Sequence, residues 1–383
     1  MWFFRRKKNS EGDQEQSPDE KPGILTVPEG HPTIQDAIDA APVGSTVIVM
    51  PGRYREVIDF RGKDITVRSE SPNDRQTVTD TVIDAEQRGT VVSFCNGESD
   101  EAKLAGFTLT GGRGDPYGPP SGGGVTVRNR SGPIIESNVI VANRSELDGG
   151  GICVDDSWPI ISRNQILDNE AAGCGGGIHI GWDAARVEAR VEPLAMKNLE
   201  GYLDKASPGG FGIATGEGES EDDLRDFMTQ WESLEDEEEG ERRRPRLDSN
   251  TIVGNEALSG GGLHVSDESP FIEGNVFRGN RAGRGGGVCF WDNSRPVVSG
   301  NHIVANEATE EGGGMIIEWG SAPALIGNRF SGNISGRDQG LSISQNSAPV
   351  VRSNQFDSSR CHAVFLWQKH RAILEGNTFE GGP

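Results

Sequence analysis

The feature of this sequence that most constrains its fold is an internal repeat of about 26 residues. Six of the eight repeats contain GGG and an apolar segment, then a proline, then two asparagines, and the last two repeats keep only part of this pattern. The proline position holds Pro133, Pro159, Pro245, Pro270, Pro296, Pro323 and Pro349, with Ala372 in the last repeat. The first asparagine position holds Asn138, Asn164, Asn250, Asn275, Asn301, Asn328, Asn354 and Asn377. The second holds Asn143, Asn169, Asn255, Asn280, Asn306 and Asn333. Such a period predicts a solenoid, in which each coil stacks on the next.

Each repeated residue type has a physical reason in a solenoid. Glycine tolerates positive φ and close backbone approach, so GGG predicts a sharp corner in every coil. Stacked asparagines can bond through their side-chain amides at the ~4.8 Å spacing of neighbouring strands, which sets the register. Strands alternate faces, so a column that never accepts a polar residue is predicted to face the core. One such column holds Ile140, Ile166, Ile252, Phe277, Ile303, Phe330, Phe356 and Phe379. The other holds Val125, Ile152, Ile178, Leu263, Val288, Met315, Leu341 and Val364.

The start of a solenoid needs a cover, because an open end exposes core side chains and an unpaired strand edge. The segment TIQDAIDAAP precedes the regular coils and has apolar residues at helical spacing. It predicts a capping helix from Thr33 to Ala41. The fold class predicted for the chain is therefore an all-β, single-stranded parallel β-helix with an N-terminal capping helix.

One step of the repeat is too long, because Asn164 and Asn250 are 86 positions apart, which is one coil plus about 60 further residues. We expect residues 183–244 to form an insertion looped out of the β-helix. It holds 18 Asp and Glu against 8 Lys and Arg, so it supplies -10 of the formal net charge of -22. Apolar residues at helical spacing from Leu224 to Leu234 predict an amphipathic helix. This helix could pack on the solenoid flank, lie within a disordered acidic loop, or act as a lid or partner-binding element.

The remaining domain boundaries follow from composition. Residues 1–22 are rich in charged and polar residues after a short apolar start, and they predict a disordered tail before a β-helix over 23–383. The basic block follows the first apolar residues, which reverses the order of a secretory signal. A cytoplasmic location is therefore favoured, with an extracellular one as the alternative. No segment approaches the ~18 apolar residues that cross a bilayer.

Charge and cysteine content exclude some classes of function. A net charge of -22 argues against a nucleic-acid partner, because phosphate binding needs clustered Lys and Arg. An acidic polysaccharide would also be repelled unless a cation intervened. The five cysteines are widely spaced, with neither a CxxC pair nor a zinc-finger spacing. They indicate reduced thiols.

The repeat GGGICVDDSWPIISRNQILDNEAAGCGGG resembles those of the pectate-lyase-like superfamily of right-handed parallel β-helix proteins, over residues 24–383 apart from the insertion. The resemblance implies a right-handed solenoid with the pectin lyase fold. The superfamily includes pectate lyases, polygalacturonases, pectinesterases, alginate-modifying enzymes and proteins without a demonstrated reaction, so the fold does not decide the activity. The segments TIQDAIDAAP and PGRYREV are similar to the start of pectinesterases, but the later motifs of those enzymes are absent. Only Asp155 and Asp156 match an element of polygalacturonases. No catalytic set is therefore carried over.

A polar column follows each GGG on the outward face of the strand. It reads Thr126, Cys153, His179, His264, Cys289, Ile316, Ser342 and Phe365. The four consecutive residues from Cys153 to Cys289 are of the types that bind zinc. Because successive coils are ~4.8 Å apart and zinc bonds are only ~2.0 to 2.3 Å long, at most two neighbouring residues of the column could bind the same ion. His179 and His264 are weak candidates for a metal site, and an ordinary outward column is the competing interpretation.

The turn after this column carries tryptophans and carboxylates. Aromatic rings can stack on sugars, and paired carboxylates can perform acid and base chemistry. The candidate catalytic residues are Asp155, Asp156, Asp267 and Asp292. The candidate substrate-binding residues are Trp158, Trp182, Trp291, Glu318, Trp319 and Trp367. Calcium held by Asp155, Asp156, Asp267 or Asp292 is compatible with hard oxygen ligands. The competing explanation is structural, because Asp and Asn favour turns and tryptophan shields sheet ends.

Two hypotheses of function follow. The first is a scaffold whose extended surface binds a polysaccharide or a protein without catalysis. The alternative is a polysaccharide lyase or glycoside hydrolase of the pectate-lyase-like type, which would act from the turn that carries the tryptophans and carboxylates.

Overall fold

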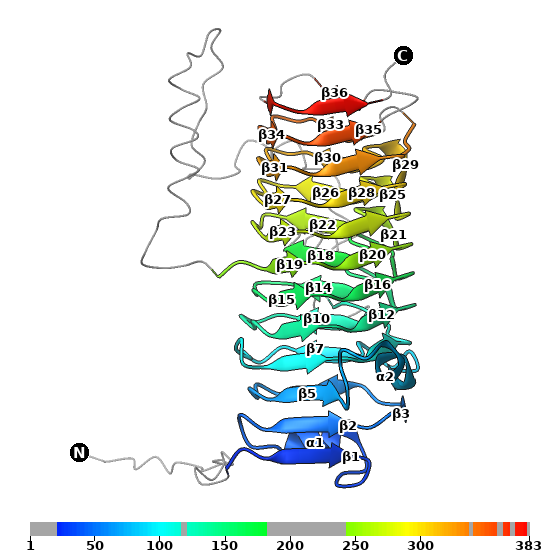
Figure 1. Ribbon diagram of the computed structural model, residues 1–383, viewed down its shortest axis with the longest axis vertical. Coiled ribbons are helices and arrows are strands. Elements are labelled where there is room, and N and C mark those ends of the chain that lie inside the picture. Colours follow the sequence, from blue (N-terminus) through cyan, green and yellow to red (C-terminus); the bar gives the residue numbers. More distant parts are fainter. Residues whose placement is uncertain are drawn as a thin grey trace, which may run out of the picture.

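The computed structural model of the protein is a long stack of short parallel strands (Figure 1). It describes residues 21–115, 121–181, 243–336, 340–357, 363–367 and 372–380. One coil contributes one strand to each of three sheets, A, B and C, and five coils add a strand to a fourth sheet, D. In the coil that begins with β14, for example, the chain passes from sheet C to A, then to B and D. Within the described residues the stack is thus a mostly-β parallel solenoid, as the repeat predicts.

The strand bounds are as follows, in the order in which the strands lie in each sheet. Sheet A consists of β1 (Ile24–Val27), β2 (Thr46–Val49), β5 (Thr66–Ser69), β8 (Lys103–Ala105), β11 (Ile134–Glu136), β15 (Ile160–Ser162), β19 (Arg246–Asp248), β23 (Phe271–Glu273), β27 (Val297–Ser299), β31 (Ala324–Ile326), β34 (Val350–Arg352) and β37 (Ile373–Glu375). Sheet B consists of β3 (Gly52–Tyr54), β6 (Thr81–Asp84), β9 (Thr108–Thr110), β12 (Val139–Val141), β16 (Gln165–Leu167), β20 (Thr251–Val253), β24 (Val276–Arg278), β28 (His302–Val304), β32 (Arg329–Ser331), β35 (Gln355–Asp357) and β38 (Thr378–Glu380). Sheet C consists of β4 (Ile58–Asp59), β7 (Val92–Phe94), β10 (Val125–Val127), β14 (Ile152–Val154), β18 (Ile178–Gly181), β22 (Leu263–Ser266), β26 (Val288–Trp291), β30 (Met315–Ile317), β33 (Leu341–Ile343) and β36 (Val364–Leu366). Sheet D consists of β13 (Arg144–Ser145), β17 (Glu170–Ala171), β21 (Glu256–Ser259), β25 (Arg281–Arg284) and β29 (Glu307–Glu311). Sequence reasoning did not foresee sheet D.

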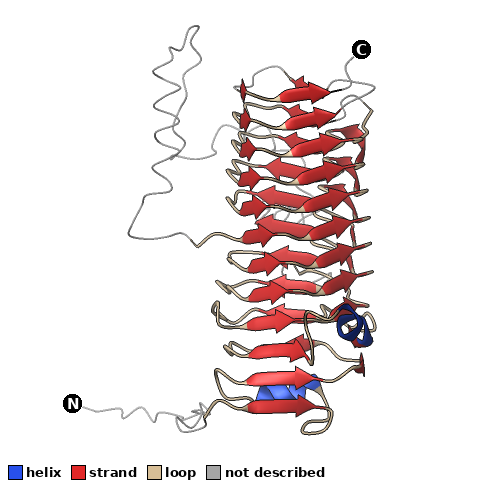
Figure 2. Cartoon of the chain, in the orientation of Figure 1, coloured by secondary structure: helices blue, strands red, loops and turns tan. Residues whose placement is uncertain are grey.

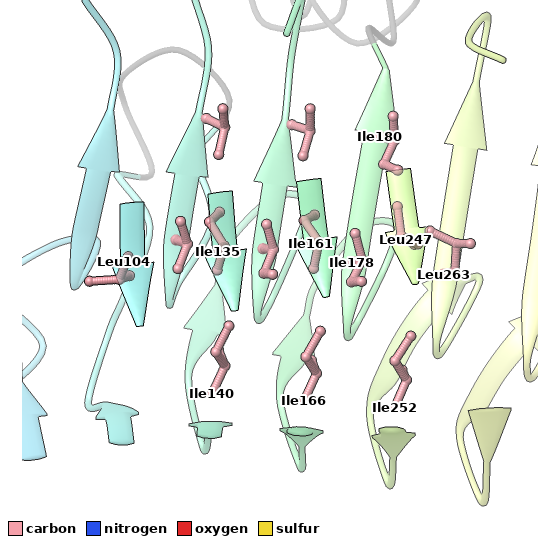
Figure 3. Packing of buried hydrophobic residues seen from close by; sticks show 14 of the residues in the cluster. Leu104, Ile135, Ile140, Ile161, Ile166, Ile178, Ile180, Leu247, Ile252 and Leu263 are labelled. Carbon is pink, nitrogen blue, oxygen red and sulfur yellow. The ribbon is translucent and has the colours of Figure 1, made fainter. Parts of the chain in front are cut away.

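The core is a continuous apolar column inside the three main sheets. Figure 3 shows Ile140, Ile166 and Ile252 in line on successive strands of sheet B, as the alternation of faces predicts. These side chains are fully buried. Phe379 is the exception in its predicted core column, because it is 59% exposed. It lies on β38, the last strand in the order of sheet B, so no further strand covers it within the described residues.

The two asparagine columns form hydrogen-bonded ladders through the solenoid, which confirms the prediction for these residues. Asn138 Nδ2 donates to Asn164 Oδ1 at 3.1 Å, and Asn164 Nδ2 donates to Asn250 Oδ1 at 3.1 Å. The ladder therefore continues in register across residues 182–242. The predicted insertion at 183–244 lies almost entirely outside the described residues, as does most of the predicted tail at 1–22.

The glycine corners are tight for two separate reasons. Gly260 has φ +64°, a left-handed conformation that glycine adopts without steric cost. A Cβ atom on Gly262 would lie 2.6 Å from the carbonyl oxygen of Gly287 in the next coil. The first position therefore needs glycine for its backbone angle, and the second needs it for the approach between coils.

Two short helices lie on the solenoid, α1 (Ile34–Ala40) and α2 (Arg75–Asp80) (Figure 2). Helix α1 lies beside β1 and β2 with Ile34, Ala37 and Ile38 buried, and Thr33 accepts a hydrogen bond from Asp36 N as its N-cap. Helix α2 was not predicted. Neither of these helices, the ones found in the described part of the chain, is long and apolar enough to cross a membrane.

Candidate functional site on the outer face of sheet C

The outer face of sheet C carries two columns of side chains, and these contain most of the polar groups singled out in the sequence. The first column holds Ser93, Thr126, Cys153, His179, His264, Cys289, Ile316, Ser342 and Phe365, in the printed register of neighbouring strands. The second column lies two residues further along each strand and holds Cys95, Arg128, Asp155, Gly181, Ser266, Trp291, Glu318, Ser344 and Trp367. We refer to this surface as the sheet C face.

The first column points outward as predicted, yet most of it is buried. Cys153, His179 and His264 are each at most 3% exposed. The glycine corners pack against it, because a Cβ atom on Gly149 would lie 2.7 Å from Cys153 Cβ and one on Gly260 would lie 2.9 Å from His264 Cβ. Alternation along a strand predicts which way a side chain points, but it does not reveal what folds back over it.

The N-terminal part of the sheet C face contains a cavity of about 310 Å³. It lies between β4, β7 and β10, and its lining combines carboxylate, guanidinium, hydroxyl and thiol groups. The polar lining residues are Asp59, Thr90, Ser93, Cys95, Asp115, Ser121, Thr126 and Arg128. A concave site with a few converging polar groups is typical of small-ligand binding.

Arg128 is the one cationic side chain among the described residues that line this cavity. Its Nε is buried and has no hydrogen-bond partner, and no ion pair of Arg128 is found among the described residues. A guanidinium presents several donors in a fork that matches a carboxylate. Burial raises the pKa of the adjacent Cys95 thiol, although Arg128 opposes this shift. The thiol is therefore protonated near neutral pH, so Cys95 does not neutralise the Arg128 guanidinium, which shares the lining with the carboxylates of Asp59 and Asp115.

Asp155 follows Arg128 in the second column, one coil further on. Burial raises the pKa of Asp155, the neighbouring Asp156 raises it further, and His179 and Arg128 oppose the shift. A carboxyl that keeps its proton to a higher pH than usual can serve as a general acid. Of the four candidate catalytic residues, Asp155 is the one that the structure brings into electrostatic contact with a cavity-lining residue.

The other three candidate catalytic carboxylates share a different environment. Asp156, Asp267 and Asp292 are exposed and have φ values of +41°, +52° and +48°. Each occupies the turn position that follows the second column, where the chain leaves sheet C for sheet A. Asp and Asn tolerate this left-handed conformation better than most residues, so turn formation accounts for the residue type at these positions.

The tryptophans predicted to bind substrate are distributed along the same side. Trp291 and Trp319 lie together, with ring centroids 5.3 Å apart and planes inclined at 45°. Trp158 is half-buried beneath the Arg243 guanidinium, which lies 5.6 Å from its ring centroid. Trp367 contacts Phe365 edge to face at 5.1 Å. Trp182 lies outside the described residues.

Among the carboxyl groups that the structure describes, Glu318 has the most strongly raised pKa. It is fully buried between Trp291 and Ser344 in the second column, and burial raises its pKa to about 7, although Arg284 opposes the shift. Arg284 Nη2 donates to Glu318 Oε1 at 2.5 Å and also lies 3.4 Å from Glu311 Oε2. Ser344 Oγ donates to Glu318 Oε1 at 3.2 Å, whereas Glu318 Oε2 has no partner. Glu318 therefore ties sheet C to β25 of sheet D.

The histidine pair considered for metal binding is in register across the insertion point. His179 pairs with His264, and the rings stack with centroids 5.4 Å apart and planes inclined at 11°. His179 Nε2 lies 3.0 Å from the carbonyl oxygen of Gly181. Within the described ranges no group of three or more His, Cys, Asp or Glu residues is arranged to hold a metal ion. The calcium and two-histidine hypotheses remain predictions.

Sequence reasoning missed Arg128, Asp59 and Arg284. Arg128 could have been found, because it follows Thr126 by the same two residues that separate Asp155 from Cys153 and Glu318 from Ile316. Asp59 precedes the regular repeat, and Arg284 belongs to the unforeseen sheet D, so no repeat column pointed to either of them.

The fold and this outward face define a protein of the parallel β-helix class. Residues 239–383 match the family model described as "Right handed beta helix region". This part of the chain is thus similar to right-handed β-helix proteins, as the resemblance of its repeats implies.

Two solved structures are similar in overall arrangement. One is an alginate lyase from Paenibacillus sp. str. FPU-7, with 10% identity over 94% of this chain and 98% of that chain, at a TM-score of 0.34. The other is the A-module of the mannuronan C-5 epimerase AlgE6 of Azotobacter vinelandii, with 16% identity over 91% of this chain and 94% of that chain, at a TM-score of 0.36. No curated protein matches the sequence. These likenesses are too distant to assign residues or activity.

Proposed function

We propose that the protein cleaves a polysaccharide that carries carboxylate groups, and that the reaction takes place in the cavity of the sheet C face. The observation that carries this proposal is the Arg128 guanidinium, which lines the cavity without an ion-pair partner. The proposal places the enzyme hypothesis ahead of the non-catalytic scaffold. The two structures similar in arrangement are proteins named for acting on alginate or mannuronan.

The chemistry of an acidic sugar fits these groups. A guanidinium bound to a uronate carboxylate withdraws charge from it and makes the neighbouring carbon-bound proton easier to remove. The Asp59 carboxylate in the cavity can take up this proton, and a carbon–carbon double bond then forms as the bond to the glycosidic oxygen breaks. Asp155 supplies a carboxyl whose raised pKa suits proton donation to the departing oxygen. Elimination by such a set makes this a lyase, whereas attack by water would make it a glycoside hydrolase.

The negative charge of the chain does not exclude an acidic substrate. Charges more than about 8 Å apart on the surface are largely screened at physiological ionic strength. By our count the predicted insertion holds much of the net charge, whereas Arg128 acts at contact distance on a ligand in the cavity.

The test is a comparison of product formation by Arg128 variants. Replacing Arg128 with alanine is expected to lower the rate of cleavage of polygalacturonate or alginate about 100-fold, because one preorganised donor to developing charge is lost. Unsaturated ends and reducing ends should be measured separately, with and without calcium. Unsaturated ends would identify a lyase, and reducing ends alone would identify a hydrolase.

Arg130 provides a matched control, since it lies in the same turn and is exposed. Arg130→Ala should retain the cleavage rate. Equal rates for the wild type and Arg128→Ala, or no product from either polymer, would refute the proposal. Retention of polymer without product would favour the binding scaffold instead.

Two structural predictions accompany this proposal. We infer that α1 closes the N-terminal end of the core, because its buried face, formed by Ile34, Ala37 and Ile38, lies against the first strands. Residues 183–244 remain a predicted acidic insertion, which in the sequence falls between β18 and β19.

A further inference from the structure

One turn position of the solenoid is occupied by an unexpected residue type. The position that follows the second column has positive φ in six coils, where it holds Asn129 (+59°), Asp156 (+41°), Asp267 (+52°), Asp292 (+48°), Trp319 (+52°) and Gln345 (+54°). Asn and Asp suit this conformation because their short side chains bond locally. Trp319 has a bulky side chain and no such compensation.

The presence of Trp319 at this position therefore requires a reason other than the turn. A bulky residue in the left-handed region is strained, and such strain tends to concentrate at functional sites. The other coils establish that a polar residue forms the same turn. The chain thus has tryptophan at a turn position where the backbone of Asn or Asp would be less strained.

The surroundings of Trp319 form a small aromatic platform. Its side chain is among the exposed large apolar groups, with 47% of its surface accessible. It contacts the half-buried Trp291 at a centroid separation of 5.3 Å. The adjacent Glu318 is hydrogen-bonded to Arg284 and Ser344, which fixes the backbone next to Trp319. Asp292 and Asn293 are exposed in the neighbouring turn.

We propose that Trp319 and Trp291 form a second saccharide-binding site, on which a pyranose ring of the polysaccharide stacks outside the Arg128 cavity. Tryptophan offers a rigid apolar face for the axial hydrogens of a sugar, and the exposed Asp292 and Asn293 side chains can accept or donate bonds to its hydroxyls. The ligand recognised here is the ring face, so the site needs no charge on the sugar. The link to a common substrate rests on the proposed function.

The position of the platform sets a length requirement. Trp319 and Asn129 occupy equivalent turn positions five coils apart, which corresponds to ~24 Å at ~4.8 Å per coil. Asn129 is the neighbour of Arg128. A short oligosaccharide can occupy the cavity or the platform, but only a longer chain can occupy both, and its affinity gains from the linkage of the two sites.

The experiment uses Trp319→Asn, because asparagine suits the backbone conformation and removes the ring. Binding of long polygalacturonate chains and of a trisaccharide prepared from them should be measured by calorimetry, with calcium in both series. The variant is expected to bind long chains about 10-fold more weakly, and to bind the trisaccharide at the cavity with unchanged affinity while losing its binding at the platform. Its melting temperature should equal or exceed that of the wild type, which separates lost binding from lost folding. Unchanged affinity for long chains would overturn the proposal.

A neutral ligand separates this inference from the proposed function. Cellohexaose should quench tryptophan fluorescence in the wild type and in Arg128→Ala, but not in Trp319→Asn. Gln345→Asn, a substitution at the same turn position in the following coil, is the control and should retain the quenching. If cellohexaose quenches all variants equally or none, the platform is not a saccharide site, whatever the outcome for Arg128 and cleavage.

Discussion

Replacing Asn250 with alanine is expected to lower the free energy of unfolding by about 4 kcal/mol, because several buried hydrogen bonds are lost at once. Asn250 Nδ2 donates to the Ile161 carbonyl oxygen at 2.8 Å and to Asn275 Oδ1 at 2.9 Å. Its Oδ1 accepts from Asn164 N at 3.0 Å and from Asn164 Nδ2 at 3.1 Å. Alanine would leave the buried Asn164 N–H without its acceptor and would remove one bond each from Asn164 Nδ2 and Asn275 Oδ1, which keep bonds to Ile135 O and Asn250 N. A buried polar group left without a partner costs ~1 to 3 kcal/mol, and each further lost bond adds to that cost.

The measurement is denaturant unfolding followed by circular dichroism. Asn377→Ala is the matched control, since Asn377 lies at the end of the same ladder and its bonds are only partly buried. Asn377→Ala should lower the free energy of unfolding clearly less than Asn250→Ala does. Equal losses at the two positions would contradict the view that burial makes the ladder stabilising.

Replacing Glu318 with glutamine is expected to stabilise the protein above pH 7 by up to ~3 kcal/mol, with the gain vanishing toward pH 4.5. The pKa of Glu318 is raised from its ordinary value of 4.5 to about 7, chiefly by burial. The folded protein therefore binds a proton at this site more tightly than the unfolded chain does. As the pH rises from about 4.5 to about 7, the wild type loses stability, and the loss is complete above pH 7. Glutamine carries no charge and removes this dependence.

Thermal or denaturant unfolding at pH 5 and pH 8 measures this effect as the difference between the wild type and the variant. Other ionisable groups contribute to both proteins, so they cancel in the difference. Glu307→Gln controls for the loss of one negative charge, because Glu307 is exposed and pairs with Arg281. A difference between wild type and Glu318→Gln that is the same at both pH values would contradict the expected titration.

Repeat columns predicted the parts of the fold that recur in every coil. The inward Ile and Phe columns, the asparagine ladders and the corner glycines follow from local rules of alternation, side-chain amide bonding and backbone angle. Each rule acts within a coil or between neighbouring coils, so the residues of one aligned column are sufficient to predict the feature. The helix at Ile34–Ala40 was likewise predicted from local spacing, whereas α2 and sheet D lie outside the aligned columns and were missed.

The candidate site was only partly predicted, because its chemistry depends on contacts between segments that the repeat does not relate. The sequence singled out Asp155, Glu318 and Trp319 from their place in the turn. It did not reveal that Asp155 lies near Arg128, or that Glu318 is bonded to Arg284, which lies in sheet D. It also grouped Asp156, Asp267 and Asp292 with Asp155, although their positive φ values give them a local role in the turn.

By itself, the sequence determined that this chain is a β-helix, which side chains point inward, and which face of each coil carries polar groups. These properties repeat with the coil, and strand alternation and glycine geometry are sufficient to specify them. Only the tertiary structure decided which outward groups are buried, which are paired, and where a cavity lies. Burial and pairing arise where the corner segments and sheet D fold against sheet C, and those contacts give Glu318 its raised pKa, leave Arg128 without an ion pair, and leave Trp319 exposed.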